Sequence, residues 1–440
     1  MRVKSFLRSI GKVIVTKEIF ENKILLRLLY KYFLIGMLIR FIFLPFFFHA
    51  DLLSTYNRAA QTVFSGNFGS DFHQVITNMI HSAYLFIIKF IIPDINNYSN
   101  ILLENSWVKL ISSENIFMVL FIFKLLYLFF DVICMFLIIR LLYDDEPEKK
   151  VKIFKYWVLN PIVIFVTYIF ARHDIIGITL TLIAILLAKY RRKYLAMVVL
   201  ALAIAVRFFP IMILPILIFY LARKKKDYII LFSIGITGLI AIEVFSHFYF
   251  NSSVILPLIN TQHFNFILSS KLELINHDRI FYFVAVYILI ILSFLHQRRK
   301  NLNLFLNYCA IIFMMYVSIC YFHPQYLLWI VPFLILIFIR RNSLFYYHWI
   351  QFILLMIILI YWGDGVTKFL LTPIDPKFFI YMTGPIPILN RFYSAVKFVN
   401  IARSIFTGIT LWMIYLIYKE NKNVLSGKSI VDINNNLVKK

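Results

Sequence analysis

The chain has 440 residues, of which 62% are hydrophobic and only 15% are charged. An ordinary soluble domain is closer to half apolar and a quarter charged, so these proportions exclude a soluble enzyme of the usual kind. Apolar runs of about twenty residues recur along the chain, which is the length that crosses the hydrocarbon core of a bilayer. The sequence therefore predicts an all-α, polytopic membrane bundle, because a β-barrel would show short segments of alternating hydrophobicity.

The formal net charge of the chain is +24. In a soluble protein a charge of this size would suggest a nucleic-acid partner. Here the Lys and Arg residues gather in short clusters between apolar runs, so membrane topology explains them better and we expect no nucleic acid. The first residues, Met1 to Lys31, are basic and only patchily apolar, which indicates a cytoplasmic segment rather than a cleavable signal peptide.

Taken in chain order, the apolar runs predict about twelve transmembrane spans within a single transmembrane domain, residues 1–440. The expected spans lie near residues 30–48, 116–142, 155–170, 174–189, 193–207, 208–222, 227–249, 279–296, 303–321, 325–340, 345–362 and 398–418.

The connections between these spans alternate in charge. Basic clusters follow every second span, near residues 149–155, 191–193, 223–226, 298–300, 340–341 and 419–422. By the positive-inside rule, those connections and both termini face the cytoplasm. We therefore expect a multi-pass protein, with the plasma membrane of a prokaryote as its location.

The remaining connections fall on the outer side as three larger loops, residues 49–115, 250–278 and 363–397. In the first loop, the semi-apolar stretch from Met79 to Ile92 is flanked by polar residues, which is typical of an amphipathic helix at the membrane interface. The third loop is rich in Pro and Gly, so irregular structure is expected there.

Titratable or hydrogen-bonding side chains recur at the expected outer ends of the spans. They are Asp51 after the first span, Arg172, His173 and Asp174 after the third, Arg207 at the end of the fifth, and His323, Gln325 and Tyr326 before the tenth. Because these ends share one membrane depth, the side chains could assemble a site at the outer interface.

Each of these residues also has a purely structural interpretation. Asp51 could be a solvated helix flank, Arg172 could extend to lipid head groups, and His323 could be a satisfied interfacial histidine. Arg207 is harder to explain in this way, because a cation within an apolar segment costs roughly 3 kcal/mol at the membrane centre unless an anion meets it. We expect a lipid phosphate to be that anion.

Two charged residues also fall inside the second expected span. Lys124 and Asp131 are seven positions apart and share a helix face, so we expect them to pair within the bundle.

Three stretches of the sequence have a common family pattern. The first holds His49-Ala50-Asp51-Leu52 with Tyr56 and the later His81-Ser82-Ala83, the second holds Asn160-Pro161, Ala171-Arg172-His173-Asp174 and Val206-Arg207-Phe208-Phe209-Pro210, and the third holds Phe322-His323-Pro324-Gln325-Tyr326. Together they resemble the GT-C superfamily of membrane glycosyltransferases, particularly the polyprenyl-phosphate-mannose-dependent mannosyltransferases. The chain departs from that pattern where Arg172-His173 replaces Gly-Gln and Arg207 replaces Lys.

The resemblance implies a GT-C-like bundle with interfacial helices in the first outer loop. It implies a polyprenyl-phosphate-linked sugar donor, with mannose the expected hexose, and a lipid or glycan acceptor on the non-cytoplasmic face, among membrane lipids. Asp51 would be the catalytic base of an inverting transfer, and Arg207, Arg172 and His323 would bind the donor phosphate. The other residues expected to contact substrate are His49, Tyr56, Arg58, His81, His173, Asp174, Gln325 and Tyr326.

The resemblance leaves a divalent cation open, since some relatives resemble metal-dependent enzymes. Asp51 has no acidic residue at positions 49, 50, 52 or 53, which favours a site without a tightly bound metal. Asp71, in the same loop, is the acid that could join it in space.

Two other classes of function fit the composition. A polytopic transporter or lipid flippase would also have about twelve spans, but it would more often show internal repeats and polar residues near the membrane midplane. An accessory subunit that retains the fold without activity is the third alternative.

Overall fold

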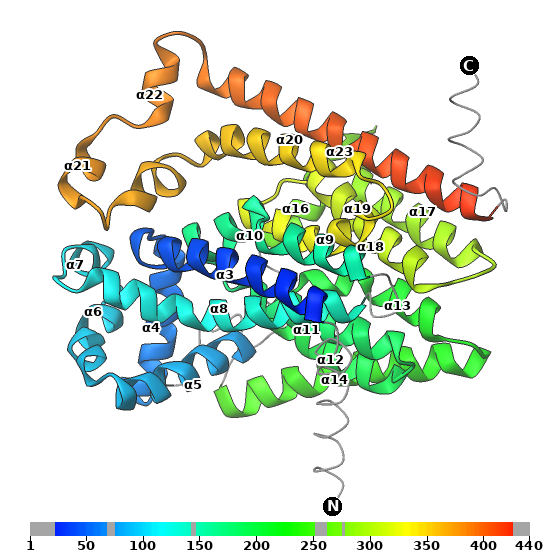
Figure 1. Cartoon of the computed structure of the whole chain (residues 1–440), viewed down its shortest axis with the longest axis horizontal. Coiled ribbons are helices and arrows are strands. Elements are labelled where there is room, and N and C mark those ends of the chain that lie inside the picture. Colours follow the sequence, from blue (N-terminus) through cyan, green and yellow to red (C-terminus); the bar gives the residue numbers. More distant parts are fainter. Residues whose placement is uncertain (1–22, 68–74, 142–146, 251–261, 275–277, 426–440) are drawn as a thin grey trace, which may run out of the picture.

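The computed structural model describes residues 23–67, 75–141, 147–250, 262–274 and 278–425. Asp71 and most of the segment Met1–Lys31 lie outside these residues. The described chain is helical almost throughout, and its long helices run side by side across the molecule (Figure 1). The expected all-α bundle is confirmed.

Six helices are long and apolar enough to cross a membrane, judged on the described residues. They are α3 (Lys23–Phe46), α8 (Ile116–Leu141), α14 (Lys225–Phe250), α18 (Leu302–Ile319), α20 (Ser343–Ile358, continued by η6, Leu359–Trp362) and α23 (Ala395–Leu425). A seventh span is formed if α9 (Pro147–Val158) and the segment α10 (Pro161–Ile164) with η2 (Phe165–Ile169) count as one bent helix. These helices mark the chain as a membrane protein.

The other expected spans are also helical, but they are short. They are α11 (Asp174–Lys189), α12 (Lys193–Val206), η3 (Phe209–Ile213) with α13 (Leu214–Leu221), α17 (Tyr282–His296), and η5 (Pro324–Trp329) with α19 (Val331–Phe338). With 16 and 14 residues, α11 and α12 fall below the about twenty needed to cross a bilayer. Length and composition therefore support six or seven crossings, and the count of twelve stays an expectation.

The large first loop contains more helix than the sequence predicted. Its elements are α4 (Ala50–Ser65), α5 (Val75–Ile91), η1 (Pro93–Tyr98), α6 (Ser99–Leu103) and α7 (Trp107–Ile111). The helix expected at Met79–Ile92 is present as α5. The amphipathic helix α4 was not predicted, although Asp51 in its first turn and Gly66 in the left-handed conformation at its end are ordinary helix-boundary signals.

The other two large loops contain only short elements. In residues 363–397 they are η7 (Asp364–Val366), η8 (Lys368–Leu371), α21 (Pro376–Tyr381) and α22 (Pro385–Asn390). In residues 250–278 the described elements are α16 (Gln262–Ile267) and β1 (Lys271–Glu273), which pairs antiparallel with β2 (Arg279–Phe281). This hairpin was not predicted.

The expected outer loops meet at one end of the bundle, where α4, α5, α6 and α7 gather in Figure 1. The ring of Trp107 stacks on Phe369 with centroids 5.8 Å apart, which joins the first loop to the third. Phe266 of the second loop lies 5.5 Å from His323, which in turn contacts Trp362 at 4.5 Å. The three loops expected on the outer side, which alternate with the basic connections along the sequence, therefore contact one another in space.

The basic connections contact one another elsewhere. Lys193, the first residue of α12, forms an ion pair of 2.7 Å with Asp227 at the start of α14. Tyr156 of α9 donates a hydrogen bond to Asn342, just before α20. The bundle therefore has a basic end distinct from the end that carries Asp51.

The ion pair expected between Lys124 and Asp131 is wrong. Lys124 instead donates to the carbonyl oxygens of Phe47 and Tyr168. Asp131 accepts from Arg40 Nε at 2.6 Å, from Trp157 Nε1 and from the Tyr168 hydroxyl. The physical reason is distance, because seven residues of α-helix separate two side chains by roughly 10 Å along the axis. Each charge therefore finds its partner on a neighbouring element.

Candidate active site

The N-terminus of α4 positions the first candidate residues. His49 precedes the helix in an extended conformation, and its Nδ1 accepts a hydrogen bond from the Asp51 backbone N–H at 3.2 Å. Such a cap fixes the direction in which the helix starts, and it satisfies one of the N–H groups that the first turn leaves free. Asp51 is thereby held in the first turn, at the helix end that favours a negative charge.

A distorted turn brings Arg172 to the same place. The segment η2 is a π-helix, a rare form that often occurs at functional sites. It ends at Ile169, and two residues later Ala171 has a φ of 54°, in the left-handed region that costs a residue with a side chain about 1–2 kcal/mol. Arg172 follows, with its backbone N–H bonded to the carbonyl oxygen of Val166. The strained turn thus fixes the start of the Arg172 side chain.

Asp51 and Arg172 form a direct ion pair between Oδ2 and Nη1. The Asp51 side chain is 46% exposed and that of Arg172 is 12% exposed, so the carboxylate remains open to solvent. Burial alone would raise the pKa of the Asp51 carboxyl, but the neighbouring positive charges, that of Arg172 above all, outweigh it and lower that pKa. Burial lowers the pKa of His49 to about 4. At neutral pH Asp51 is therefore ionised and His49 is neutral.

Asp174 and Arg207 form a second ion pair beneath the first. Arg207 Nη2 lies 2.7 Å from Asp174 Oδ2, while Trp329 Nε1 donates to Oδ1 at 2.8 Å. Both charged side chains are almost fully buried. Asp174 is therefore the anion that compensates the burial of Arg207, and the expectation that a lipid phosphate also meets Arg207 stays a prediction. A phosphate contact would be additional, through Arg207 Nε, which has no partner among the described residues.

Gly177 makes the approach of Arg207 possible. A Cβ atom at Gly177 would lie 3.1 Å from Arg207 Cβ and 3.2 Å from the ring of Phe209. These distances are tight for carbon atoms, so glycine allows the segment after α12 to pack close to the first turn of α11. The guanidinium consequently reaches Asp174, one turn earlier on α11.

The candidate histidines of the first loop are packed in the interior. His81 Nδ1 lies 2.7 Å from the carbonyl oxygen of Thr77, which can only accept, so Nε2 accepts from the Tyr127 hydroxyl at 3.1 Å. The His81 ring is 5.8 Å from His173 and 5.4 Å from Tyr56. These three residues therefore form a buried wall beside the arginines, out of reach of solvent.

Arg58 supplies a cation that is not balanced by an acid. Its Nε donates to the Ser54 carbonyl oxygen, and it forms no ion pair with any described carboxylate. Burial, together with the charge of Arg172, lowers the pKa of Arg58. Three arginine cations thus share the site with the two carboxylates Asp51 and Asp174, which leaves one positive charge for an anionic ligand.

The third motif, Phe322-His323-Pro324-Gln325-Tyr326, adds aromatic and amide side chains to the site. The ring of His323 packs against Phe266 and Trp362, with centroids 5.5 Å and 4.5 Å away. Tyr326 stacks on Trp329 with centroids 3.9 Å apart, and Gln325 Oε1 is buried without a partner in the described chain. Because Trp329 also donates to Asp174, Tyr326 belongs to the same cluster as the ion pairs, in which only Asp51 and the residues around its carboxylate are partly open.

The donor groups around Asp51 do not fit a divalent cation. Its Oδ2 already contacts Arg172, whose positive charge disfavours a second cation there. Within the described ranges, no three His, Cys, Asp or Glu side chains are grouped so that they could hold a metal ion. Asp71 lies outside those ranges.

Sequence reasoning missed the residues that complete the cluster. Trp329 fixes the second oxygen of Asp174, Tyr127 fixes His81, and Trp362 packs on His323. Trp329 follows the third motif directly, but nothing in its spacing indicates a contact with α11. These partners become visible only in three dimensions.

The chain matches no known protein family, and neither curated proteins nor solved structures give a significant match. Any assignment of function therefore rests on the residues and their geometry.

Proposed function

We propose that the protein is an integral membrane glycosyltransferase of the GT-C type, which transfers a hexose from a polyprenyl-phosphate donor to a lipid or glycan acceptor. Mannose is the sugar we expect. The single observation that carries the proposal is a solvent-accessible, ionised carboxylate, Asp51, held against Arg172 in a cluster with one excess cation.

Of the two carboxylates in the cluster, Asp51 is the one suited to act as a base. Asp174 is fully buried and both of its oxygens are engaged, by Arg207 and Trp329. Asp51 has a partly exposed carboxylate that an acceptor hydroxyl can approach. A positioned carboxylate of this kind can remove the proton of the attacking hydroxyl, which typically contributes 10²–10⁴-fold to the rate.

The arginines suit the leaving group. In the proposed step the acceptor oxygen forms a bond to the anomeric carbon, its proton passes to Asp51, and the bond from the anomeric carbon to the phosphate oxygen breaks with its electron pair. Polyprenyl phosphate leaves with an added negative charge, which cations placed beforehand stabilise. Arg58 and Arg172 are the nearest candidates, with Arg207 and His323 behind them. Direct displacement by a single base gives inversion at the anomeric carbon.

The grouping of the loops supports a location for the site. The Asp51 cluster lies at the end of the bundle opposite the basic connections, and basic loops favour the cytoplasm. We therefore propose that about twelve helical segments, with α5 at the interface, present the site on the non-cytoplasmic face of a prokaryotic plasma membrane, with both termini cytoplasmic.

The test is transfer of labelled mannose from polyprenyl-phosphate mannose by the purified full-length protein. Asp51→Asn is expected to lower the rate by about 10²–10⁴-fold. Glu104→Gln is the matched control, because it makes the same acid-to-amide change on an exposed residue of the same loop, and it should leave the rate unchanged. Full activity in Asp51→Asn, or movement of the intact donor lipid without product, would contradict the proposal.

A further inference from the structure

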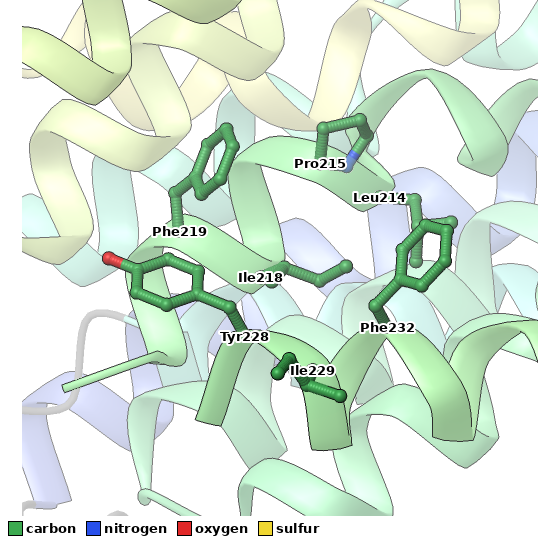
Figure 2. Close-up of a pocket in the computed structure, with 7 residues that line it drawn as sticks. All are labelled: Leu214, Pro215, Ile218, Phe219, Tyr228, Ile229 and Phe232. Atoms are coloured by element: carbon green, nitrogen blue, oxygen red, sulfur yellow. The ribbon is translucent and has the colours of Figure 1, made fainter. Parts of the chain in front are cut away.

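A groove with apolar walls lies at the basic end of the bundle, away from the Asp51 cluster. Its volume is about 400 Å³, within the range of ligand pockets. It is lined by Leu214, Pro215, Ile218 and Phe219 of η3–α13 and by Tyr228, Ile229 and Phe232 of α14. Figure 2 shows Ile218 and Ile229 between the two aromatic sides of the groove.

The packing of α14 explains why the groove stays open. A Cβ atom at Gly238 would lie 2.9 Å from Ala201 Cβ, and one at Gly235 would lie 3.2 Å from Met197, so α14 approaches α12 very closely. Ile229 and Phe232, which line the groove, are 71% and 57% exposed. Since α14 is long and apolar enough to cross a membrane, this exposed face meets lipid chains rather than water.

Cations stand at the rim of the groove. The exposed residues Arg223 and Lys224 connect α13 to α14, the two helices that form its walls, and the exposed residues Lys225 and Lys226 begin α14. The nearby acid, Asp227, does not balance them, because Oδ1 binds Lys193 and Oδ2 accepts the backbone N–H groups of Arg223 and Lys224. Among the described residues, the four side chains form no ion pair with a carboxylate.

Aromatic side chains lie between the apolar walls of the groove and the basic residues Arg223–Lys226. The rings of Phe219 and Tyr228 lie 5.8 Å apart, within a turn or two of the basic residues on their respective helices. Arg191, from the neighbouring turn, lies over the ring of Tyr220 at 5.5 Å. A cationic rim beside an apolar slot is complementary to an anionic head group joined to an acyl chain.

We infer that this groove binds one acyl chain of an anionic glycerophospholipid, with the lipid phosphate held by the Arg223–Lys226 cluster. The site is separate from the proposed donor site, because it lies among the basic connections and contains none of the Asp51 cluster. The bound lipid fills the space between α13 and α14, and it ties the beginning of α14 to the membrane surface.

The experiment is native mass spectrometry of the full-length protein in detergent, titrated with dioleoyl phosphatidylglycerol. Dioleoyl phosphatidylcholine and undecaprenyl phosphate are the comparison lipids. One phosphatidylglycerol is expected to bind in preference to phosphatidylcholine, and undecaprenyl phosphate, which the proposed donor site would hold, should not displace it from the groove. Equal binding of phosphatidylcholine, or binding of undecaprenyl phosphate alone, would overturn the inference.

Two variant pairs locate the lipid. Ile229→Trp places a large side chain in the groove and should abolish retention, whereas Ile240→Trp, exposed on the same helix outside the groove, should not. The double variant Lys224→Gln with Lys225→Gln should weaken binding roughly 25-fold, because each cation near a membrane surface contributes about fivefold to the affinity for an anionic lipid. Arg298→Gln with Arg299→Gln removes the same charge from another exposed connection and should change binding by less than about twofold.

The double Lys variant keeps the test independent of folding, because both side chains are exposed. Unchanged affinity in that variant, or in Ile229→Trp, would show that the lipid binds elsewhere. None of these changes touches the Asp51 cluster, so loss of lipid with intact sugar transfer separates this inference from the proposed function.

Discussion

Replacement of Asp174 by Asn tests whether the buried ion pair with Arg207 holds the site together. The carbonyl oxygen of Asn can still accept from Trp329 Nε1, so the main loss is the negative charge. Arg207 would then remain as a cation that is 2% exposed and has no counter-ion. Breaking a buried pair in this way typically costs about 3–5 kcal/mol, because the remaining charge stays desolvated.

The double variant Asp174→Asn with Arg207→Met separates the ion pair from other effects. A buried pair replaced by neutral groups of similar size is often close to neutral in stability. We therefore expect the double variant to be more stable than Asp174→Asn alone, with a coupling energy of about 2–3 kcal/mol.

Equilibrium unfolding of the four proteins of this cycle in mixed micelles, followed by far-ultraviolet circular dichroism, measures that coupling. Asp94→Asn is the control, since Asp94 is exposed in η1 and the change should stay within about 0.5 kcal/mol. Additive single-variant costs, or an Asp174→Asn cost as small as that of the control, would refute the reasoning.

Two further predictions concern the turn that carries Arg172. Arg172→Gln removes the main charge that lowers the pKa of Asp51, so that pKa rises. Because the proposed base acts only when deprotonated, the acid limb of kcat/KM against pH should move to higher pH, and an unmoved limb would contradict Asp51 as the base. His49, with a pKa of about 4, should contribute no limb near pH 6.5. Ala171→Gly should raise the free energy of unfolding by about 0.5–1 kcal/mol, because glycine adopts the φ of 54° without a Cβ clash. A less stable variant in the same unfolding assay would show that the turn is not strained.

The helices themselves follow closely from hydrophobic pattern. The helix end before Pro324 was predicted, since proline lacks the N–H that a helix interior needs. The break at Asn160-Pro161 was not, because residues 155–170 were expected to form one span, whereas α9 ends at Val158 and α10 begins at Pro161. The number of membrane crossings could not be predicted from the sequence, because α11 and α12 are short and mostly buried. Hydropathy does not distinguish a lipid-facing helix from one that is enclosed by protein. The helix α4 was missed for a related reason, since an amphipathic helix of modest hydrophobicity gives no strong apolar signal.

The candidate residues could be named from sequence because charges within an apolar chain are few and costly. Their partners could not be assigned. Asp174 forms an ion pair with Arg207, for which a lipid phosphate was the expected anion. The partner of Asp131 is Arg40 rather than the expected Lys124. Sequence separation says little about such pairs, since 33 positions separate Asp174 and Arg207, while 91 separate Arg40 and Asp131.

The sequence by itself determined that this is a helical membrane protein, that its basic connections alternate along the chain, and which polar side chains are out of place among apolar residues. Those properties depend on composition and local period, which every segment carries on its own. Only the tertiary structure decided which charges neutralise each other, why Arg58 remains an excess cation, and why Asp51 rather than Asp174 has an accessible carboxylate. Those properties depend on which helix ends meet in space, and the close packing allowed by residues such as Gly177 sets that arrangement.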